Sequence, residues 1–310
     1  MPPERVVFVG AVTLDTIALV DHMPGPDERH IAEDLVRAGG GPAATAAVAA
    51  ARLGLADVHF VGAVGDDEDG DRAVASLAEE GVGVSGVVRV PSRPTGASVV
   101  LVDRSRGTRA ICTRRVPEPV LPARSPAVEL VRTASWVHVD HLGWPAVSGF
   151  PAGPGSEGTD HRPRLSVDAG NPIPGYHPRG VALDVPTDAS LTARYGTADL
   201  ETALARAVGD GADCVVATRG ARGSVALTAD GRRASAPGLP VDLVSTLGAG
   251  DVFHGALLTA VVRGEPLVRC LEYANAVAAL SCRGLDGRSH IPTHRETTAF
   301  LSAAVSAARP

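Results

Sequence analysis

The sequence contains no lysine, and all 29 basic residues among its 310 are arginines. We attribute this to a coding bias rather than to selection for function. Whatever its cause, the absence excludes several chemistries. A Walker A phosphate loop and the active site of protein kinases each need a lysine, and so does catalysis through a Schiff base. Any phosphate chemistry of this chain must therefore rely on other groups.

Aromatic residues are also scarce, at 3% of the chain. Aliphatic side chains must fill the core, and the aromatic platforms that stack single-stranded nucleic acids are not expected. The 29 basic residues face 35 acidic ones, which gives a net charge of −6. A chain with this balance has no general electrostatic attraction to nucleic acids or anionic membranes, so we expect neither as a partner.

Cysteines are few and lack the paired spacing of a zinc site or a redox motif. The four are Cys112, Cys214, Cys270 and Cys282, and we expect buried, reduced thiols. No apolar stretch approaches the roughly 20 residues that a membrane span needs. The apolar run near the N-terminus is too short for a signal peptide. Together these features predict a cytoplasmic protein.

What the sequence does contain is a regular alternation of short β-branched runs with alanine-rich helical segments. The expected strands are 5–12, 57–65, 135–142, 164–169 and 213–220, and the expected helices are 43–54, 71–81 and 252–264. The strand segments are apolar throughout, which is typical of parallel strands covered on both faces. We therefore predict one domain over 1–310, with a three-layer α/β/α fold and a mainly parallel central sheet.

Two segments break this rhythm, at about 15–38 and 96–116. Both alternate apolar and polar residues, as antiparallel strands with one solvated face do. We expect them to form a small β-sheet that projects from the main body. Residues 145–163 and 171–178 are rich in proline and glycine and are expected to be surface loops.

The strongest local signal is a glycine-rich turn between an apolar run and a helical pattern, at Gly248-Ala249-Gly250-Asp251. Small residues let backbone N–H groups approach an anion, and the start of a helix adds a favourable dipole. Asp251 has an ordinary explanation as a helix-stabilising carboxylate. Beside an anion site, however, a carboxylate also suits removal of a proton from a hydroxyl during phosphoryl transfer. Without lysine, backbone amides and a metal ion would have to stabilise the charge.

Two motifs, about 200 residues apart, resemble the signatures of the PfkB (ribokinase-like) family of carbohydrate kinases. STLGAGDVFHGAL (245–257) resembles the C-terminal signature, and AGGGPAATAAVAAARLG (38–54) with FVGAVGDDEDGD (60–71) resembles the N-terminal one. The wording is most similar to the branch that contains sulfofructose kinase. The resemblance implies a ribokinase-like fold in which the small sheet is a lid, ATP and Mg²⁺ as cofactors, and a homodimer formed through the lid.

The same resemblance assigns roles to residues of this chain. Asp251 would be the catalytic base, with Gly248, Ala249 and Gly250 forming the anion hole for the phosphoryl group. The implied sugar-binding residues are Asp15, Gly40, Gly41 and Thr45, and the implied ATP-binding residues are Thr218, Gly220, Gly223 and Asn275. Ordinary alternatives stay open: Asp15 as a turn carboxylate, residues 218–223 as a plain turn, and Asn275 as a solvent-facing residue of a helix.

The chain departs from the family pattern at two places that concern ions. Ser245 stands where the signature usually begins with an aspartate that helps to bind a monovalent cation, so potassium activation is left open. The family's Asn-x-x-Glu segment corresponds to residues 187–190, where Asp188 is the one carboxylate. Asp188, or Asp184 nearby, is then the candidate partner of Mg²⁺ through water. Three histidines have no chelating spacing and are expected to be structural: His138, His141 and His254.

The choice of sugar is expected to depend on the lid and on residues 138–144. Arginines on the lid suit an anionic sugar, because a guanidinium matches the oxygens of sulfonate, phosphate or carboxylate groups. Any one of them alone is better explained as a solvated charge, and two or more that converge would suit an anionic sugar. The candidates on the predicted lid strands are Arg29 and Arg109, together with Arg114 and Arg115. Thr113 and Leu142 replace polar residues of the sulfofructose-kinase branch, so sulfofructose itself is not predicted.

These patterns predict an ATP-dependent sugar kinase that transfers the γ-phosphoryl group to a primary hydroxyl. One alternative is a nucleoside kinase of the same fold, against which the scarcity of aromatic residues counts. Another is a catalytically weak protein that binds a sugar or a nucleotide, which the missing Asn-x-x-Glu segment would explain. The intact Asp251 and its glycines favour the kinase.

Overall fold

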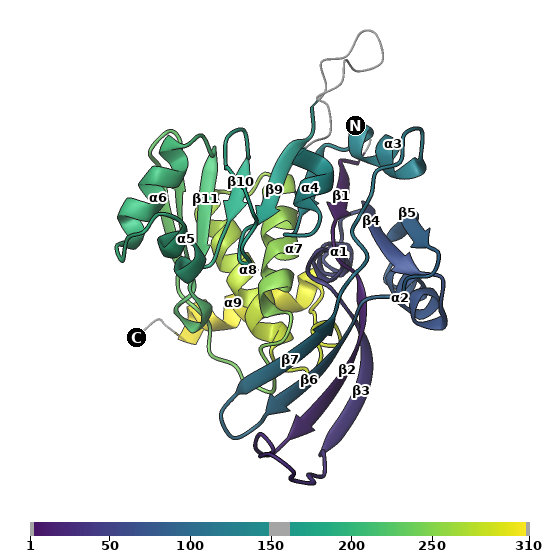
Figure 1. Cartoon of the computed structure of the whole chain (residues 1–310). Helices are drawn as coiled ribbons and strands as arrows, with labels where there is room; N and C mark the ends of the chain where they lie inside the picture. The colour runs from purple at the N-terminus through teal and green to yellow at the C-terminus, as the bar shows by residue number, and fades with distance from the viewer. Residues whose placement is uncertain (1–2, 149–161, 308–310) are drawn as a thin grey trace.

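A nine-stranded sheet forms the centre of the described part of the chain, residues 3–148 and 162–307 of the computed structural model (Figure 1). Its strands are β1 (Arg5–Val9), β4 (Asp57–Gly65), β5 (Gly83–Val90), β8 (Trp136–Val139), β9 (Arg164–Asp168), β10 (Leu183–Val185), β11 (Cys214–Thr218), β12 (Ser224–Thr228) and β13 (Arg233–Ala236). Their order is β13-β12-β11-β10-β9-β8-β1-β4-β5. Neighbours pair in parallel except in the β11–β12 and β12–β13 pairs. The predicted mainly parallel sheet is confirmed.

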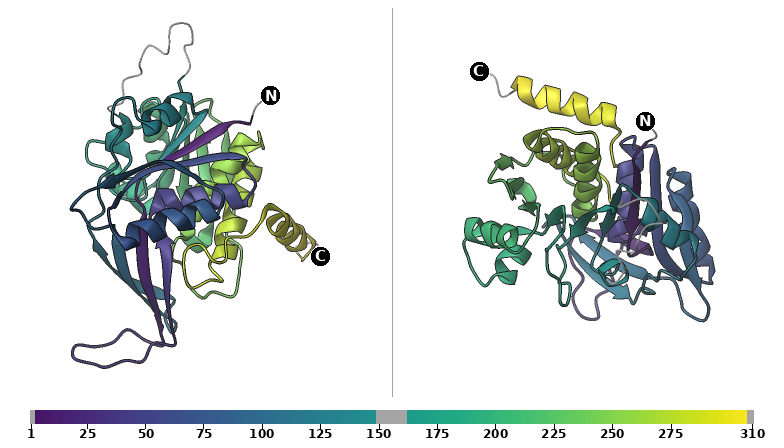
Figure 2. Two further views of the ribbon diagram at one scale, coloured as in Figure 1. Left: turned by 90° about the vertical axis from the view of Figure 1, so that its right-hand side faces the viewer. Right: turned by 90° about the horizontal axis from the view of Figure 1, so that it is seen from above.

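Helices cover both faces of this sheet (Figures 1 and 2). One face carries α1 (Pro42–Arg52), α2 (Glu68–Glu79), α7 (Ala249–Val262) and α8 (Leu267–Ser281), with α9 (His294–Ala307) against α8. The other carries α3 (Pro126–Thr133), α4 (Trp144–Ser148), α5 (Asp188–Arg194) and α6 (Leu200–Gly209). Side chains alternate along a strand, so Val216 of β11 packs on the first face while Val215 and Ala217 pack on the second. This is the predicted three-layer fold.

A separate four-stranded sheet projects from the main body and is here called the lid (Figure 1). It consists of β2 (Thr13–Val20), β3 (Asp34–Gly40), β6 (Ala97–Asp103) and β7 (Thr108–Arg114), in the order β3-β2-β6-β7. Its strands fall within or near the two segments that the sequence singled out. Pairing is antiparallel at β2–β3 and β6–β7 but parallel at β2–β6, where antiparallel strands were expected. The chain returns to the main body between β3 and β6, so β2 and β6 both leave it in the same direction.

Three smaller expectations need correction or lie outside the described residues. The proline- and glycine-rich segment 145–163 was expected to be a loop, but Trp144–Ser148 forms helix α4, and residues 149–161 are outside the described part. Cys112 is exposed on β7, whereas the other three thiols are buried as expected.

Among the helices of the described residues, none has both the length and the apolar character that crossing a membrane requires.

Close contact between α1 and α7 fixes where both helices begin, at the same edge of the sheet. Gly255 makes this contact possible, since a Cβ at this position would overlap the backbone carbonyl of Ala46 in α1. The facing surface of α1 is a run of fully buried small residues, including Ala46 and Ala49. Small side chains let two helices approach closely. The contact at Gly255, about one turn after the first residues of α7, therefore holds the N-terminus of this helix in place.

We therefore expect Gly255→Ala to destabilise the fold although alanine favours helices. Forcing an extra methyl group into this contact should lower the free energy of unfolding by about 1–3 kcal/mol. The matched control is Gly209→Ala at the end of α6, where a Cβ meets no neighbour within 4 Å. That change should be neutral or stabilise by up to about 1 kcal/mol. Urea denaturation measures both, and equal stabilisation by the two changes would show that α1 and α7 separate freely.

Candidate active site

Three carboxylates gather at the edge of the sheet where the parallel strands end. Asp140 follows β8, Asp168 is the last residue of β9, and Asp251 lies in the first turn of α7. They are close enough that the charges of Asp168 and Asp140 both act on Asp251. Ligands of open α/β sheets bind outside the carboxyl ends of the strands. This edge is therefore the candidate active site.

The turn before Asp251 is shaped by Gly248, the N-cap of α7. Gly248 has a φ of 73°, and a Cβ there would overlap the backbone of Gly287, so two conditions require glycine. The amides of Gly250 and Asp251 belong to the first turn and have no carbonyl one turn earlier within the helix. The Ala249 amide instead lies 3.3 Å from the Thr246 carbonyl oxygen. The predicted anion hole is thus a helix start with exposed backbone at Gly250.

Asp251 is a carboxylate whose charged form is disfavoured by its surroundings. Burial raises the pKa of Asp251 to about 7, and the negative charge of Asp168 adds to this effect. The positive charges of His254 and Arg109 act in the opposite direction. Asp251 as a residue is half-buried at the helix start, whereas the residues that follow it in α7 are buried in the core. A partly accessible carboxylate with a pKa near neutrality is well suited to accept a proton.

His254 forms an ion pair that the sequence did not reveal. Its Nε2 lies 3.1 Å from Oδ1 of Asp168, with both side chains buried. Burial alone would raise the pKa of Asp168, but the charge and hydrogen bond of His254 outweigh it and hold this pKa at about 2. Burial also opposes the charge of His254, yet Asp168 raises its pKa. A buried ion pair is compatible with the structural role expected of His254, but the sequence analysis did not identify its partner; its position three residues after Asp251 places both side chains on one side of α7.

His138, the neighbour of His254, is different in character. Burial, and next the nearby positive charge of His254, lower the pKa of His138 to about 3. The ring is neutral and its Nδ1 lies 3.0 Å from Oγ of Ser166. It packs between Phe8 and His254, with ring centroids 5.3 Å from each. His138 thus has the structural role that was expected.

Asp140 holds three parts of the site together. One oxygen accepts the N–H groups of Ala11 (2.7 Å) and Ala43 (3.2 Å), and the other accepts those of Leu142 (2.9 Å) and Gly143 (2.8 Å). These donors lie after β1, in the first turn of α1 and after β8. The four backbone donors offset part of the cost of burying this side chain, whose pKa burial still raises. The sequence analysis did not identify Asp140.

The predicted sugar-binding residues meet where the lid joins the main body. Oδ1 of Asp15 accepts the N–H of Ser98 at 2.8 Å, and burial raises the pKa of Asp15. A Cβ on Gly40 would overlap the other oxygen of Asp15. Gly41 caps α1 with a φ of 93°, and a Cβ there would overlap the backbone of Ala11. The glycine pair is therefore needed for the close approach of β3, β2 and α1.

Arg288, a buried arginine that the sequence analysis overlooked, lies beside these residues. It donates from Nε to Oγ1 of Thr45 (3.2 Å), from Nη2 to the carbonyl of Gly40 (2.8 Å) and from Nη1 to Oγ of Ser76 (3.4 Å). All three acceptors are neutral. Burial lowers the pKa of Arg288 to about 10, and the charge of Asp15 opposes this. Because Arg288 lies in the loop between α8 and α9, no local motif connects it to β3.

The predicted ATP-binding loop lies against the segment that follows β13, and that segment in turn contacts α8. Residues 218–223 form the end of β11 and the 3-10 turn Gly220–Arg222, and a Cβ on Gly223 would overlap the carbonyl of Ala236. Asn275 is buried in α8 and donates its amide to the carbonyls of Ala236 and Pro237, both at 3.1 Å. The alternative of a solvent-facing Asn275 is wrong, and its amide fastens α8 to the segment beside the loop.

The two carboxylates expected to act on Mg²⁺ are already paired. Asp188 forms an ion pair with Arg222 and accepts the backbone N–H of Ala189. Asp184 is buried and accepts hydrogen bonds from Arg194 (2.7 Å) and from the hydroxyl of Tyr176 (2.9 Å). Both oxygens of each side chain therefore already have a partner, and an arginine is one of the two.

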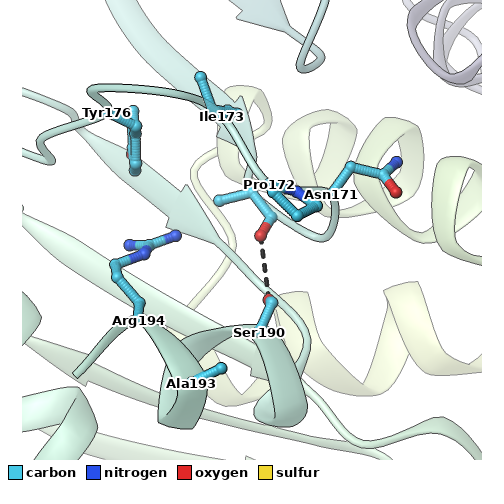
Figure 3. Close-up of a pocket in the computed structure, with 8 residues that line it drawn as sticks. Asn171, Pro172, Ile173, Tyr176, Ser190, Ala193 and Arg194 are labelled. Atoms are coloured by element: carbon cyan, nitrogen blue, oxygen red, sulfur yellow. Dashed lines mark hydrogen bonds between the residues drawn. The ribbon is translucent and has the colours of Figure 1, made fainter. Parts of the chain in front are cut away.

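A pocket of about 260 Å³ lies beside Asp184, between residues 169–176 and helix α5 (Figure 3). Tyr176 and Arg194 stand on one side of it, and the Arg194 guanidinium lies 4.8 Å from the centre of the Tyr176 ring. Opposite them, the hydroxyl of Ser190 donates to the Ala169 carbonyl at 3.0 Å. None of the three carboxylates of the candidate active site is among the residues that line this pocket.

The two candidate lid arginines differ in what they contact. Arg109 of β7 donates to Oγ1 of Thr246 at 2.7 Å, two residues before Gly248, and its charge reaches Asp251. Arg29 is exposed in the loop after β2, whereas Asp15 lies near the start of that strand. The expectation that Arg29 joins the sugar-binding residues is therefore not met within one chain.

The raised pKa of Asp251 predicts how its replacement affects stability. An aspartate with a folded pKa near 7, against 3.8 for the ordinary group, destabilises the fold as pH rises between these values. Asparagine has no such charge, so Asp251→Asn should raise the melting temperature, by more at pH 8 than at pH 5. The control Asp242→Asn changes an exposed carboxylate and should have little effect at either pH. A pH-independent difference in calorimetry would contradict the raised pKa.

Comparisons with known proteins give the family of this chain. The sequence pattern of the pfkB family carbohydrate kinase matches residues 3–131 and 179–294. The ATP-dependent ribose-1-phosphate kinase of Halopiger xanaduensis is 31% identical over 299 residues, which cover 96% of this chain and 98% of the relative. The ribokinase of Haemophilus influenzae is 25% identical, with 96% and 98% covered. The crystal structure of a putative ribokinase from Agrobacterium tumefaciens has a TM-score of 0.86 at 26% identity, covering 98% of this chain and 99% of that one.

These relatives support the family but do not single out the sulfofructose-kinase branch, to which the sequence seemed most similar. Both family signatures fall within the matched residues. The match covers well over half of the chain, and the fold agrees throughout its length. The chain therefore belongs to the pfkB family of carbohydrate kinases: it is an ATP-dependent sugar kinase, a phosphotransferase with an alcohol group as acceptor.

Proposed function

We propose that Asp251 is the base of this kinase and accepts the proton of a primary sugar hydroxyl while the oxygen attacks the γ-phosphorus of ATP. The observation that carries the proposal is the pKa of about 7 of a partly exposed carboxylate in the first turn of α7. At neutral pH a substantial fraction of such a group is ionised and can take up a proton. The hydroxyl proton passes to Asp251, the new P–O bond forms, and ADP leaves.

Charge on the transferred phosphoryl group would be stabilised by the start of α7. The amides at Gly250 and Asp251 and the dipole of the 14-residue helix act together there. Arg109 adds a positive charge from the lid, where it already contacts Thr246. These groups take the place of the lysine that the chain lacks.

The His254–Asp168 pair would tune the base rather than touch the substrate. The positive charge of His254 lowers the pKa of Asp251, whereas Asp168 raises it. With both present, the two effects partly cancel. His254 is thus a positioning and charge-balancing residue, and Asp251 keeps a pKa near the working pH.

The acceptor would bind between Asp15, Gly40, Thr45 and Asp251. Asp15 retains an oxygen beside Gly40 that is suited to accept a hydrogen bond from a sugar hydroxyl. Relatives act on ribose-1-phosphate or are named ribokinases, so we propose a pentose or its phosphate as the acceptor. A sulfonated hexose is the alternative acceptor, which the similarity of the two motifs to the sulfofructose-kinase branch favours.

ATP would lie along residues 218–223 and the segment after β13, which Asn275 holds together. Mg²⁺ prefers oxygen ligands and is usually bound by one or two carboxylates together with phosphates and water. Asp168 fits this role best, because its contacts with His254 and with the N–H of Gly170 both use Oδ1 and leave Oδ2 to face the ion. When bound, the ion would neutralise negative charge on the phosphates.

A homodimer through the lid and a cytoplasmic location complete the proposal. Leu35 and Val99 are 65% and 55% exposed on the outer face of the lid. They pair with Ala18 and Thr16, two residues apart on β2, so both project from the same face. A second copy would cover these apolar side chains. Four free thiols and the use of ATP suit the cytoplasm.

The test of the proposed base is Asp251→Asn, assayed by ADP release with ribose, ribose-1-phosphate, fructose, sulfofructose and adenosine. The wild type should release ADP with at least one sugar, and its kcat/KM should rise with pH and level off above about pH 7. Loss of the base should lower kcat by about 10²–10⁴-fold. Binding of ATP and sugar, measured by calorimetry, should persist.

Asp242→Asn is the control and should keep the wild-type rate. Near-normal turnover of Asp251→Asn would remove Asp251 from the mechanism. Activity with adenosine alone would indicate a nucleoside kinase. Binding without turnover on every acceptor would instead indicate a binding protein.

Arg288 should matter for the sugar and not for ATP. Arg288→Met leaves the Thr45 hydroxyl and the Gly40 carbonyl without their charged donor, and such hydrogen bonds contribute about 1.5–3 kcal/mol. We expect the KM for sugar to rise about 10–100-fold while the KM for ATP changes by less than about threefold. Arg295→Met on the exposed face of α9 is the control. Equal effects on both KM values would point to a general structural role for Arg288.

A further inference from the structure

Two histidines and two carboxylates come together in the loop between β2 and β3, at the far end of the lid from its junction with the main body (Figures 1 and 2). They are Asp21, His22, Glu28 and His30. The proposed phosphoryl transfer makes no use of them. Within residues 3–148 and 162–307, Asp21, His22 and His30 are the one set of three such side chains with convergent ligand atoms.

Asp21 is the centre of this set. Its Oδ1 lies 3.0 Å from Nδ1 of His22 and 2.5 Å from Nε2 of His30. One ligand atom from each of the three residues lies within 4.8 Å of the other two. The two imidazole rings stand edge to face, with centroids 4.5 Å apart. The His30 side chain is only 15% exposed, so this ligand is held by its surroundings.

Glu28 contacts the opposite nitrogen of each ring. Its Oε1 lies 3.5 Å from Nε2 of His22 and 3.5 Å from Nδ1 of His30. The other oxygen of Glu28 accepts the backbone N–H of Gly25 at 2.7 Å, which fixes the carboxylate. Metal-bound histidines commonly donate their second N–H to a carboxylate in this way, which sets the tautomer and orients the ring.

The charges of the four side chains also suit a dication. With neutral imidazoles, Asp21 and Glu28 bring two negative charges to the two histidines, and one divalent ion would balance them; Glu33 of the same loop is already paired with Arg104. Two imidazole nitrogens and one carboxylate oxygen are ligands that Zn²⁺ takes at about 2.0–2.2 Å. Mg²⁺ would be a poor competitor because it prefers oxygen ligands only.

We propose that Asp21, His22 and His30 bind one zinc-type transition-metal ion, with Glu28 as the outer partner of both histidines and water in the fourth position. The ion joins the end of β2 to the segment that leads into β3. It would close the 21–33 loop and order the tip of the lid. This site is independent of the proposed phosphoryl transfer at Asp251.

The first experiment titrates tag-free protein with Co²⁺ and then Zn²⁺ in the presence of excess Mg²⁺. We expect about one equivalent of Co²⁺ to bind with the visible absorption of a four-coordinate ion, and Zn²⁺ to displace it. His22→Ala and His30→Ala should each abolish this absorption. Glu28→Gln should keep it but weaken binding about 10–100-fold, as loss of an outer partner does.

Two controls separate this site from general binding to surface histidines. His177→Ala removes an exposed histidine outside the lid, and Arg29→Ala changes the same loop without removing a ligand. Both should bind Co²⁺ as the wild type does. Retention of the signal in the His22→Ala/His30→Ala double variant, or failure to saturate near one equivalent, would overturn the proposal.

Hydrogen exchange gives a readout that does not depend on the spectrum. Zn²⁺ should slow exchange in peptides that cover residues 21–33 of the wild type, and not in His30→Ala. Because the variants lie in an exposed loop, circular dichroism should show unchanged folding. ADP release at saturating Mg²⁺-ATP should continue in His30→Ala, which would show that the active site is intact. Unchanged exchange in the wild type with Zn²⁺ bound would contradict the closing of the loop.

Discussion

Buried negative charge at one edge of the sheet is the constraint on which the site depends. Asp140, Asp168 and Asp251 each have a different form of compensation. Asp140 accepts four backbone N–H groups, and Asp168 pairs with His254. Burial still raises the pKa of Asp140 despite its four donors, and it raises the pKa of Asp251 to about 7. The incomplete compensation of the Asp251 charge destabilises the folded protein, and it also gives this carboxylate the pKa of a base. Functional sites commonly carry such a cost in stability.

A single short loop connects the two halves of the site. Gly287 packs against the backbone of Gly248 at the start of α7. The next residue, Arg288, holds Thr45 at the start of α1 and the carbonyl of Gly40 at the end of β3. Consecutive residues of the α8–α9 loop thus set the distance between the helix that carries Asp251 and the glycines beside the acceptor. Since both contacts involve backbone, the arrangement is stiff, and phosphoryl transfer depends on such positioning.

The fold was largely predictable because the spacing of apolar residues along the sequence shows which face of each helix or strand is buried. Continuous apolar strands and alanine-rich helices predicted the layers, and the alternating segments predicted the lid. Glycines also carried information, since Gly41 and Gly248 need backbone conformations that other residues rarely adopt.

Partners distant in sequence were not predictable. Periodicity tells which face of an element is buried but not which residue it meets. His254 and Asp168 are 86 positions apart, and Arg288 and Thr45 are 243 positions apart. The parallel β2–β6 pair was missed for the same reason. Asp251 was found because its chemistry lies within one local motif, which also holds His254, whereas Asp168, Asp140 and Arg109 act on it from other elements.

The absence of lysine has a physical consequence at the site, whatever its origin. Burial lowers the pKa of Arg288 only to about 10, so the group stays charged at neutral pH. A buried lysine begins about two units lower and loses its charge readily under the same desolvation. Lysine also presents a single nitrogen, whereas Arg288 uses three to reach Thr45, Gly40 and Ser76 at once. In a site crowded with carboxylates, arginine supplies a positive charge that persists and a planar fork that joins α1, α2 and β3.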